Sequence, residues 1–185
     1  AFTCEDGEIE TADSFCGDYI DFLNRCKTER EVAAYVKTLA EENGFIPFDP
    51  DGSYEPGDKV YYDNRGKAII LCVFGKQSLK SGAKIVASHI DSPRLDLKPN
   101  PLYEDTDLAL FKTHYYGGIK KYQWTAIPLS LHGVICRKDG TKVTVRLGED
   151  EGDPQFVVTD LLPHLDRQQA KRSAEDVVKG EDLNI

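Results

Sequence analysis

Two apolar runs decide the fold class of this chain: AIILCVF at residues 68–74, and IVA at residues 85–87, which continues into Ser88-His89-Ile90-Asp91. Continuous apolar runs, unlike alternating ones, are typical of strands that are buried on both faces of a sheet in α/β proteins. The first run follows Val60-Tyr61-Tyr62 and the turn signal Asn64-Arg65-Gly66, so these segments predict a hairpin. We therefore expect a mixed α/β sheet that contains both runs.

Two amphipathic helices are predicted before this sheet. Apolar residues recur at helical spacing from Asp13 to Asn24. Thr28 and Glu31 have the spacing of a capping box at the start of a second apolar stripe, and Gly44 is placed to end that helix. Neither helix carries an obvious catalytic group.

The character of the sequence changes near Leu97–Pro101, where we place a domain boundary. Beyond it, alternating strands flank the turn signal Asp139-Gly140. A further short strand is expected at residues 156–158, and a polar helical tail at residues 166–179. The second half of the chain is therefore expected to be rich in β-structure.

Composition and charge exclude several classes of protein. The chain has 23 basic and 32 acidic residues among 185, a net charge of −9, which argues against binding to nucleic acid or to an anionic membrane. No stretch approaches the roughly 18 apolar residues of a membrane span. The N-terminus, with Glu5, Asp6, Glu8 and Glu10, is acidic where a signal peptide is basic. A cytoplasmic location is the expectation.

The cysteines favour a reducing compartment. They lie at positions 4, 16, 26, 72 and 136, an odd count without a C-x-x-C pair, which suits neither a zinc finger nor a disulfide framework. Cys72 and Cys136 lie in apolar runs and are predicted to be buried and inert. The sequence contains no methionine, so its ends are not expected to be natural ends.

Histidines supply the candidates for chemistry. His89 follows a predicted strand, and Asp91, two residues on, can hydrogen-bond the ring nitrogen that does not bind a metal. A structural histidine is the alternative. His164 lies between Pro163 and Leu165, where it is either a neutral donor to an oxyanion or a half-buried surface residue. His114 and His132 are expected in packing or interface roles.

Five motifs occur in the order found in one known family: SHIDSPRLDLKP at 88–99, YGG at 116–118, Trp124, PLSL at 128–131 and LPHL at 162–165. Together they resemble the aspartyl aminopeptidase family of zinc metallopeptidases, which includes the vacuolar aminopeptidase of yeast. The resemblance runs from about Gly57 to Ile185, and bacterial members are the most similar.

The resemblance implies a fold and a set of site residues. Residues 1–97 would be the N-terminal part of a zinc-peptidase-like α/β/α catalytic domain, and residues 98–185 part of an inserted β-rich dimerisation domain. His89 corresponds to the first zinc ligand and Asp91 to its supporting carboxylate. His164 corresponds to the histidine that is offered across the dimer interface to the neighbouring subunit's active site.

The family's chemistry uses two zinc ions, a bridging carboxylate and a glutamate base to hydrolyse the first peptide bond. The bridging Asp, paired Glu, later Asp and final His belong to the family's C-terminal half. The 185 residues of this chain are therefore expected to bind zinc poorly and to be inactive on their own. We expect the protein to continue beyond Ile185. The resemblance implies a homo-oligomeric aminopeptidase, dodecameric in the family, acting on peptide N-termini, acidic ones among them. The alternative is a non-catalytic assembly module.

Overall fold

The structure is a computed structural model that describes residue 3 and residues 7–185, in two compact units, 1–92 and 93–185. The predictions that concern Cys4, Glu5 and Asp6 lie outside the described residues. The division between the units falls after Ser92, whereas the sequence places a boundary after Leu97, inside a long strand. The assignment of the two halves to a catalytic and a dimerisation domain stays a prediction.

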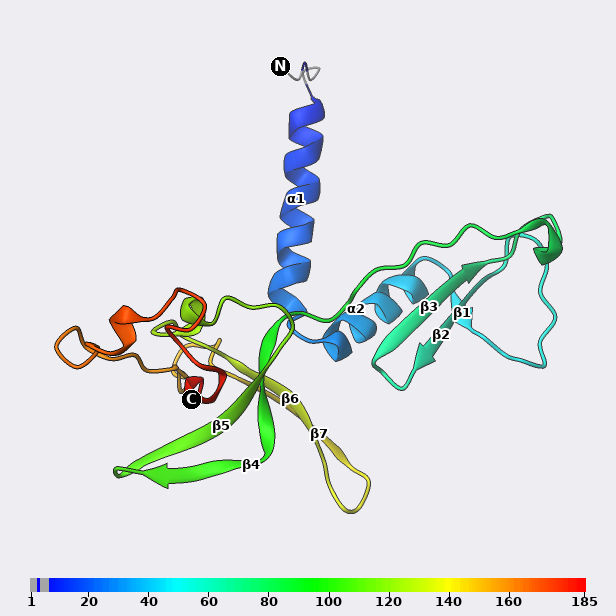
Figure 1. Cartoon of the computed structure of the whole chain (residues 1–185). Coiled ribbons are helices and arrows are strands. Elements are labelled where there is room, and N and C mark those ends of the chain that lie inside the picture. The colour runs from blue at the N-terminus through cyan, green and yellow to red at the C-terminus, as the bar shows by residue number, and fades with distance from the viewer. Residues whose placement is uncertain (1–2, 4–6) are drawn as a thin grey trace. The chain divides into compact units, whose positions relative to one another are not determined.

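Both predicted helices are confirmed in the first unit: α1 (Glu8–Arg25) and α2 (Glu29–Glu42) (Figure 1). The Thr28 hydroxyl accepts a hydrogen bond from the Glu31 amide, and the Glu31 carboxylate accepts one from the Thr28 amide at 2.9 Å. Gly44 follows α2 with a φ of +82°, a conformation that side chains disfavour. No side chain of α1 among the described residues is buried.

A three-stranded sheet follows, of β1 (Ile46–Pro47), β2 (Lys59–Asn64) and β3 (Ala68–Val73), in that spatial order. β1 runs parallel to β2, and β2 forms the predicted antiparallel hairpin with β3. Arg65 and Gly66 both have positive φ, which matches a tight hairpin turn. The element order and the mixed pairing confirm the α/β class.

The prediction that β3 is buried on both faces is wrong. α2 packs against one face of the sheet, where Tyr61 is 5% exposed and its hydroxyl donates to Glu41 Oε1 at 2.6 Å. The other face is open, and Ile70 on that face is 61% exposed. The apolar run therefore forms the expected strand, but within the described residues its far face is open, and Leu71 and Val73 on the α2 side are still 43% and 57% exposed.

The second predicted strand, at residues 85–87, is absent. After the short 3₁₀ helix η1 (Leu79–Ser81), residues 82–93 form an extended segment without assigned secondary structure (Figure 1). Ile85 and Val86 are 84% and 98% exposed. An apolar run becomes a strand only when neighbouring strands pair with its backbone, and no described segment does so here.

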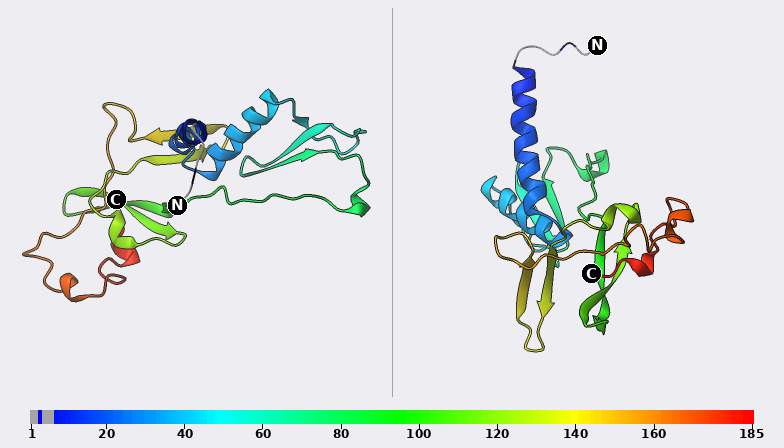
Figure 2. Two further views of the ribbon diagram at one scale, coloured as in Figure 1. Left: turned by 90° about the horizontal axis from the view of Figure 1, so that it is seen from above. Right: turned by 90° about the vertical axis from the view of Figure 1, so that its left-hand side faces the viewer.

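The second unit contains two separate hairpins: β4 (Arg94–Asp105) with β5 (Leu108–Tyr116), and β6 (Leu131–Cys136) with β7 (Lys142–Leu147) (Figure 2). The register of β4 shifts between Leu97 and Leu102, around two prolines that cannot donate to a ladder. The turn predicted at Asp139-Gly140 is confirmed, since it joins β6 and β7. The expected β-rich character of this half is therefore correct.

The end of the chain does not form the predicted helix. Residues 166–179 form turns and the short 3₁₀ helix η3 (Gln169–Lys171). Two further 3₁₀ helices lie elsewhere in the second unit: η2 (Lys121–Trp124) and η4 (Gly180–Asp182). Val178 enters the small core with Val158 and Leu183. The predicted strand at 156–158 reduces to isolated bridges. Within the described ranges, none of the helices combines the length and hydropathy that crossing a bilayer requires.

Candidate functional site

The first candidate site lies at the end of the extended segment in the first unit. Residues 87–91 line a shallow, open pocket of about 400 Å³. The His89 side chain is 95% exposed, so its ring is not part of the core. His89 lies on a segment without assigned secondary structure and not on a strand of a sheet. A ring in this position can accept a ligand from outside the described residues.

His89 and Asp91 are brought together as the sequence predicts. His89 Nδ1 lies 3.1 Å from Asp91 Oδ1, because side chains two residues apart in an extended segment point to the same side. When Nδ1 carries the proton and donates a hydrogen bond to Asp91, the lone pair of Nε2 is free for a ligand. This is the orientation that a carboxylate imposes on a histidine that binds zinc.

The donor set fits one position of a zinc site and no more. Imidazole nitrogen is an ordinary zinc ligand, and a second-sphere carboxylate raises its basicity. In the part of the chain that the structure describes, no three His, Cys, Asp or Glu side chains are arranged to hold a metal ion. A hydrolytic zinc centre needs about three protein ligands and an open position for water. The pair can therefore contribute to a metal centre but cannot complete one.

The motif after Asp91 packs against the Tyr116-Gly117 motif within the second unit. The Arg94 guanidinium lies 4.3 Å from the centre of the Tyr116 ring, and its Nε donates to Asp96 Oδ1 at 2.7 Å. Gly117 has a φ of +83°, and a Cβ there would contact Pro93 at 3.4 Å. Arg94 and Tyr116 pair across β4 and β5, and the sequence pattern does not indicate their stacking.

His164 lies in the second unit, in an exposed turn at residues 163–165. Its flanking side chains Leu161, Leu162 and Leu165 are 54%, 58% and 63% exposed. Among the described residues His164 is thus exposed, next in sequence to exposed leucines, and its ring is not desolvated. The role of His164 towards a neighbouring subunit stays a prediction.

His132 has a packing role, as expected. Its side chain is 6% exposed, and Nε2 lies 3.1 Å from Glu149 Oε1. Arg146 Nε donates to Glu149 Oε2 at 2.9 Å. Burial favours a higher pKa for Glu149, but the hydrogen bond from Arg146 and the neighbouring His132 outweigh it, so the pKa of Glu149 is lowered overall. This ionic cluster joins β6 to the end of β7.

The other histidine and the cysteines differ from one another in exposure. His114 is exposed on β5, where its ring stacks on Tyr115 at 5.6 Å between centroids. Cys72 and Cys136 are exposed, so the prediction that both are buried is wrong. Cys72 lies on the open face of the sheet and Cys136 ends β6, positions that a local apolar pattern does not reveal.

Comparison with known proteins gives a consistent result. The profile of a family described as "Aminopeptidase I zinc metalloprotease (M18)" matches residues 22–184. A protein of Clostridium acetobutylicum named "Probable M18 family aminopeptidase 1" is 49% identical over 185 residues, which cover 98% of this chain and 40% of that protein. One of the same name from Thermotoga neapolitana is 50% identical over 177 residues, 95% of this chain and 38% of that protein. The chain thus spans about 40% of the length of these relatives.

Solved structures show the same fold. The crystal structure of an M18-family aminopeptidase from Thermotoga maritima has a TM-score of 0.87 at 45% identity, covering 97% of this chain and 39% of that one. Aminopeptidase I from Borrelia burgdorferi has a TM-score of 0.82 at 42% identity, covering 86% and 40%. A Saccharomyces cerevisiae mApe1 dodecamer, at 20% identity and a TM-score of 0.68 over 82% and 36%, shares the fold.

Proposed function

This chain belongs to the Aminopeptidase I (M18) family of zinc metalloproteases, and from that premise we propose that it forms one part of the active site of a metal-dependent aminopeptidase. The observation that carries the proposal is the contact of 3.1 Å between His89 Nδ1 and Asp91 Oδ1 in an exposed segment. A histidine with a purely structural role is usually buried among the residues around it, whereas the His89 side chain is 95% exposed.

Each residue of the pair has a separate role in this proposal. His89 offers Nε2 to a zinc ion, and Asp91 accepts a hydrogen bond from Nδ1–H, which fixes the tautomer and the ring orientation. Two zinc ions, when bound, would supply a hydroxide nucleophile at neutral pH and polarise the peptide carbonyl. The remaining ligands and the general base belong, in this proposal, to the part of the relatives' length that this chain does not span.

The second unit contributes assembly and a donor in trans. Residues 98–185 act as part of a dimerisation domain inserted into an α/β/α catalytic domain that begins with residues 1–97. His164, in its turn of exposed leucines, donates to the tetrahedral intermediate in a neighbouring subunit, where the partner surface desolvates the ring. The proposed assembly is a homo-oligomer; dodecamer is the word used for the yeast structure with the same fold.

The proposed substrates are peptides with free N-termini, with acidic first residues as one preferred class. A cytoplasmic location is proposed from the cysteine pattern. Neither nucleic acid nor a membrane surface is a proposed partner, because the net charge is −9.

Substitution of His89 in the complete gene product tests the ligand assignment. His89→Ala should lower the bound zinc and reduce aminopeptidase turnover to background. His114→Ala is the matched control, because His114 is also exposed but lies on β5 without an acidic hydrogen-bond partner in the structure. Unchanged zinc content and turnover in His89→Ala would remove the basis of the proposal. Absence of zinc and turnover from the wild-type product would favour the non-catalytic assembly module.

A mixing experiment tests His164. His164→Ala should leave zinc content unchanged and lower turnover by about 10²- to 10³-fold, the usual effect of losing one oxyanion donor. Co-expression of His89→Ala subunits with His164→Ala subunits should restore part of the activity, because some sites then combine an intact His89 with an intact His164 from the neighbour. No restoration in verified mixed oligomers would show that His164 does not act in trans.

A further inference from the structure

The strand that follows the His89–Asp91 pair begins close to the pair along the chain. Residues 82–93 have no assigned secondary structure, and β4 begins at Arg94, three residues after Asp91. An extended chain advances at most about 3.6 Å per residue, so the backbone of Asp91 lies within about 11 Å of that of Arg94. Any contact that fixes Arg94 therefore restricts the positions that Asp91 can take.

The Arg94 side chain is fixed by contacts within the second unit. Its guanidinium lies 4.3 Å from the centre of the Tyr116 ring, where the ring face attracts a cation. Its Nε donates to Asp96 Oδ1 at 2.7 Å, a hydrogen bond that both charges strengthen. Only 28% of the Arg94 side chain is exposed, so water screens these contacts less than it would on an open surface. The planar guanidinium is thus held both at its face and at its edge.

The backbone just before Arg94 is fixed as well. Pro93, whose ring restricts its φ, lies against Gly117: a Cβ at Gly117 would be 3.4 Å from the Cα of Pro93. Gly117 has a φ of +83°, so its conformation and its lack of a side chain both suit this close approach. Because Tyr116 immediately precedes Gly117, the dipeptide Pro93-Arg94 packs on the dipeptide Tyr116-Gly117. We call these four residues and Asp96 the Arg94 cluster.

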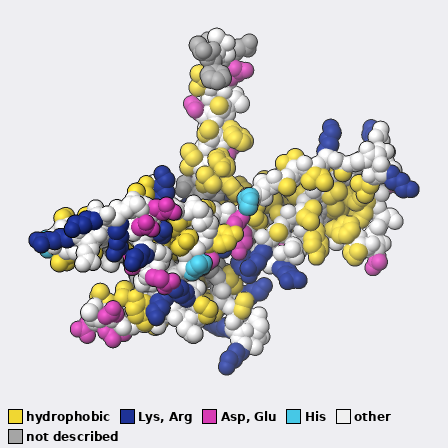
Figure 3. Space-filling model, in the orientation of Figure 1, with side chains coloured by type: hydrophobic (Ala, Val, Ile, Leu, Met, Phe, Trp, Pro, Cys, Tyr) yellow, Lys and Arg dark blue, Asp and Glu magenta, His cyan; other side chains and the backbone are white. Residues whose placement is uncertain are grey.

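Arg94 is better suited to hold neighbouring groups in place than to bind a substrate. Arginines that recognise a carboxylate or a phosphate do so with the edge of the guanidinium. The Nε on the edge of Arg94 already donates to Asp96, and Tyr116 covers one face of the group. On the side of the second unit that Figure 3 shows, Lys and Arg side chains are intermixed with Asp and Glu, whereas a surface that attracts acidic ligands carries mainly positive charge.

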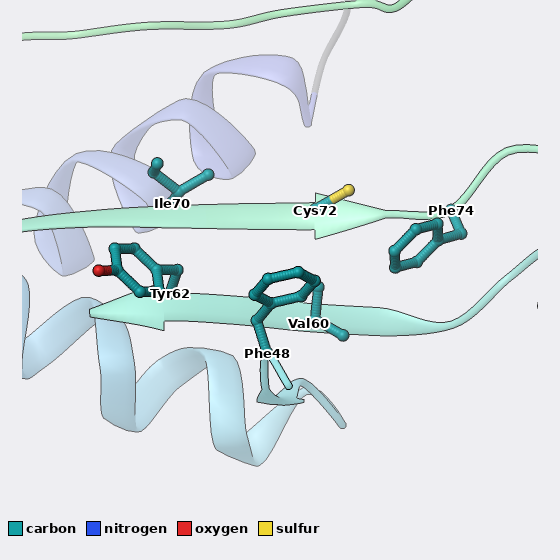
Figure 4. Close-up of a pocket in the computed structure, with 6 residues that line it drawn as sticks. All are labelled: Phe48, Val60, Tyr62, Ile70, Cys72 and Phe74. Atoms are coloured by element: carbon teal, nitrogen blue, oxygen red, sulfur yellow. The ribbon is translucent and has the colours of Figure 1, made fainter. Parts of the chain in front are cut away.

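The apolar groove of the first unit does not supply an anchor for His89. The groove lies on the sheet face that points away from α2, and six side chains from β2, β3 and the residues that follow β1 and β3 line it (Figure 4). The Tyr62 hydroxyl and the Cys72 sulfur are the only polar side-chain atoms in this lining. None of residues 87–91, which line the other pocket, takes part in it. The Arg94 cluster is therefore the first packed group of side chains that the chain reaches after Asp91.

We propose that the Arg94 cluster positions the Asp91 carboxylate and, through it, the His89 ring, so that Arg94 is a positioning residue of the metal site. This inference deepens the proposed function and rests on it. A metal-binding side chain must be held within about 0.5 Å of its working geometry, and each added freedom of motion weakens binding. With the backbone fixed at Pro93 and Arg94, Asp91 has fewer orientations to lose when the pair binds a metal. Loosening the cluster thus lowers zinc affinity without removing a ligand.

Zinc titrations of the complete gene product against a competing chelator test this role. Arg94→Met keeps most of the side-chain length but loses the charge and the Nε donor. It should weaken zinc binding by about 3- to 10-fold, less than the loss of a direct partner of the histidine. Arg94→Lys keeps the charge and should lie between wild type and Arg94→Met. Arg137→Met, at an exposed position just after β6, is the matched control and should bind zinc as the wild type does.

A second pair of variants leaves Arg94 itself unchanged. Tyr116→Leu removes the ring on which the guanidinium lies and should weaken zinc binding by a factor similar to that of Arg94→Met. Tyr116→Phe should weaken it less, because the ring face remains. Wild-type zinc affinity in both Arg94→Met and Tyr116→Leu would overturn the proposal.

A double-mutant cycle separates positioning from a general effect on the fold. In an Asp91→Ala background, Arg94→Met should change zinc affinity by less than about 2-fold, since the carboxylate through which it acts is gone. Equal losses in the two backgrounds would contradict the proposal, because the effect would then not pass through Asp91. A higher KM for acidic peptides with unchanged zinc affinity would also contradict it, since Arg94 would then bind substrate.

The same titrations distinguish this proposal from the one on which it rests. If His89→Ala binds zinc as the wild type does, the ligand assignment fails, and the positioning role fails with it. If His89→Ala loses zinc while Arg94→Met and Tyr116→Leu keep wild-type affinity, only the positioning role fails.

Discussion

Asp91 offers the sharpest test of the metal-ligand geometry. In Asp91→Ala, His89 loses the carboxylate that lies 3.1 Å from Nδ1 and holds the ring. The ring itself is 95% exposed, so no described neighbour would hold its orientation in place of the carboxylate. We expect the affinity of the complete gene product for zinc to fall, although His89 itself is unchanged.

The size of the loss follows from the contact. Removing a second-sphere partner of a metal-binding histidine weakens metal affinity by about 10- to 100-fold, or about 1.4 to 2.7 kcal/mol. The Asp91 side chain is 28% exposed, so water screens part of the interaction and the lower half of that range applies: a loss of about 10- to 30-fold. Asp91→Asn keeps an acceptor oxygen but loses the charge. Since charge-assisted hydrogen bonds are about twice as strong as neutral ones, its loss of free energy should be about half that of Asp91→Ala.

The assay is a competitive zinc titration against a chelator of known affinity, with aminopeptidase turnover measured at saturating zinc. The expected order of affinity is wild type, then Asp91→Asn, then Asp91→Ala. Asp51→Asn, on an exposed loop of the same unit, is the control for a change of charge alone. Wild-type affinity in Asp91→Ala would refute the proposed orientation of His89. Equal losses in the two variants would refute the contribution assigned to the hydrogen bond.

Two further predictions concern stability in the 185-residue chain. Thr28→Ala removes the capping box of α2 and should lower the free energy of unfolding by about 1 kcal/mol in urea titrations, whereas Thr28→Ser should retain most of it; equal losses would show that the hydroxyl does not cap the helix. The pKa of Glu149 lies below its ordinary value of 4.5, because Arg146 and His132 outweigh the effect of burial. The ionised Glu149 therefore stabilises the fold above about pH 4.5. This contribution is lost as the pH falls through the lower pKa of the folded state. Glu149→Gln should therefore reduce the dependence of stability on pH in that acidic range, and an unchanged pH profile would contradict the cluster's role.

The elements that the sequence predicted well are those whose signals are local. The capping residues of α2 and the turn residues at 64–66 and 139–140 act on their own neighbours, so their effects are visible in the sequence. The polar tail at 166–179 has only two large apolar side chains, Val177 and Val178, both at its end, and the segment forms turns. Propensity without an apolar stripe is too weak to make a helix.

The site shows the same division. The spacing of His89 and Asp91 predicted their contact, because side chains at i and i+2 of any extended segment share a side. The family, too, could be inferred from the order of its motifs, and the match over residues 22–184 confirms it. The stacking of Arg94 on Tyr116 could not be predicted, because it depends on the register between β4 and β5.

Local signals and the order of motifs were enough to predict α1, α2, the hairpin turns, the family and the contact of His89 with Asp91. The three-dimensional arrangement was needed to show that one face of the β2–β3 sheet is open, that Cys72 is exposed and that, among the described residues, the backbone of residues 83–90 has no backbone hydrogen-bond partner. The physical reason is that an apolar run records which side chains gain from burial, whereas burial itself requires a second surface that the run does not encode.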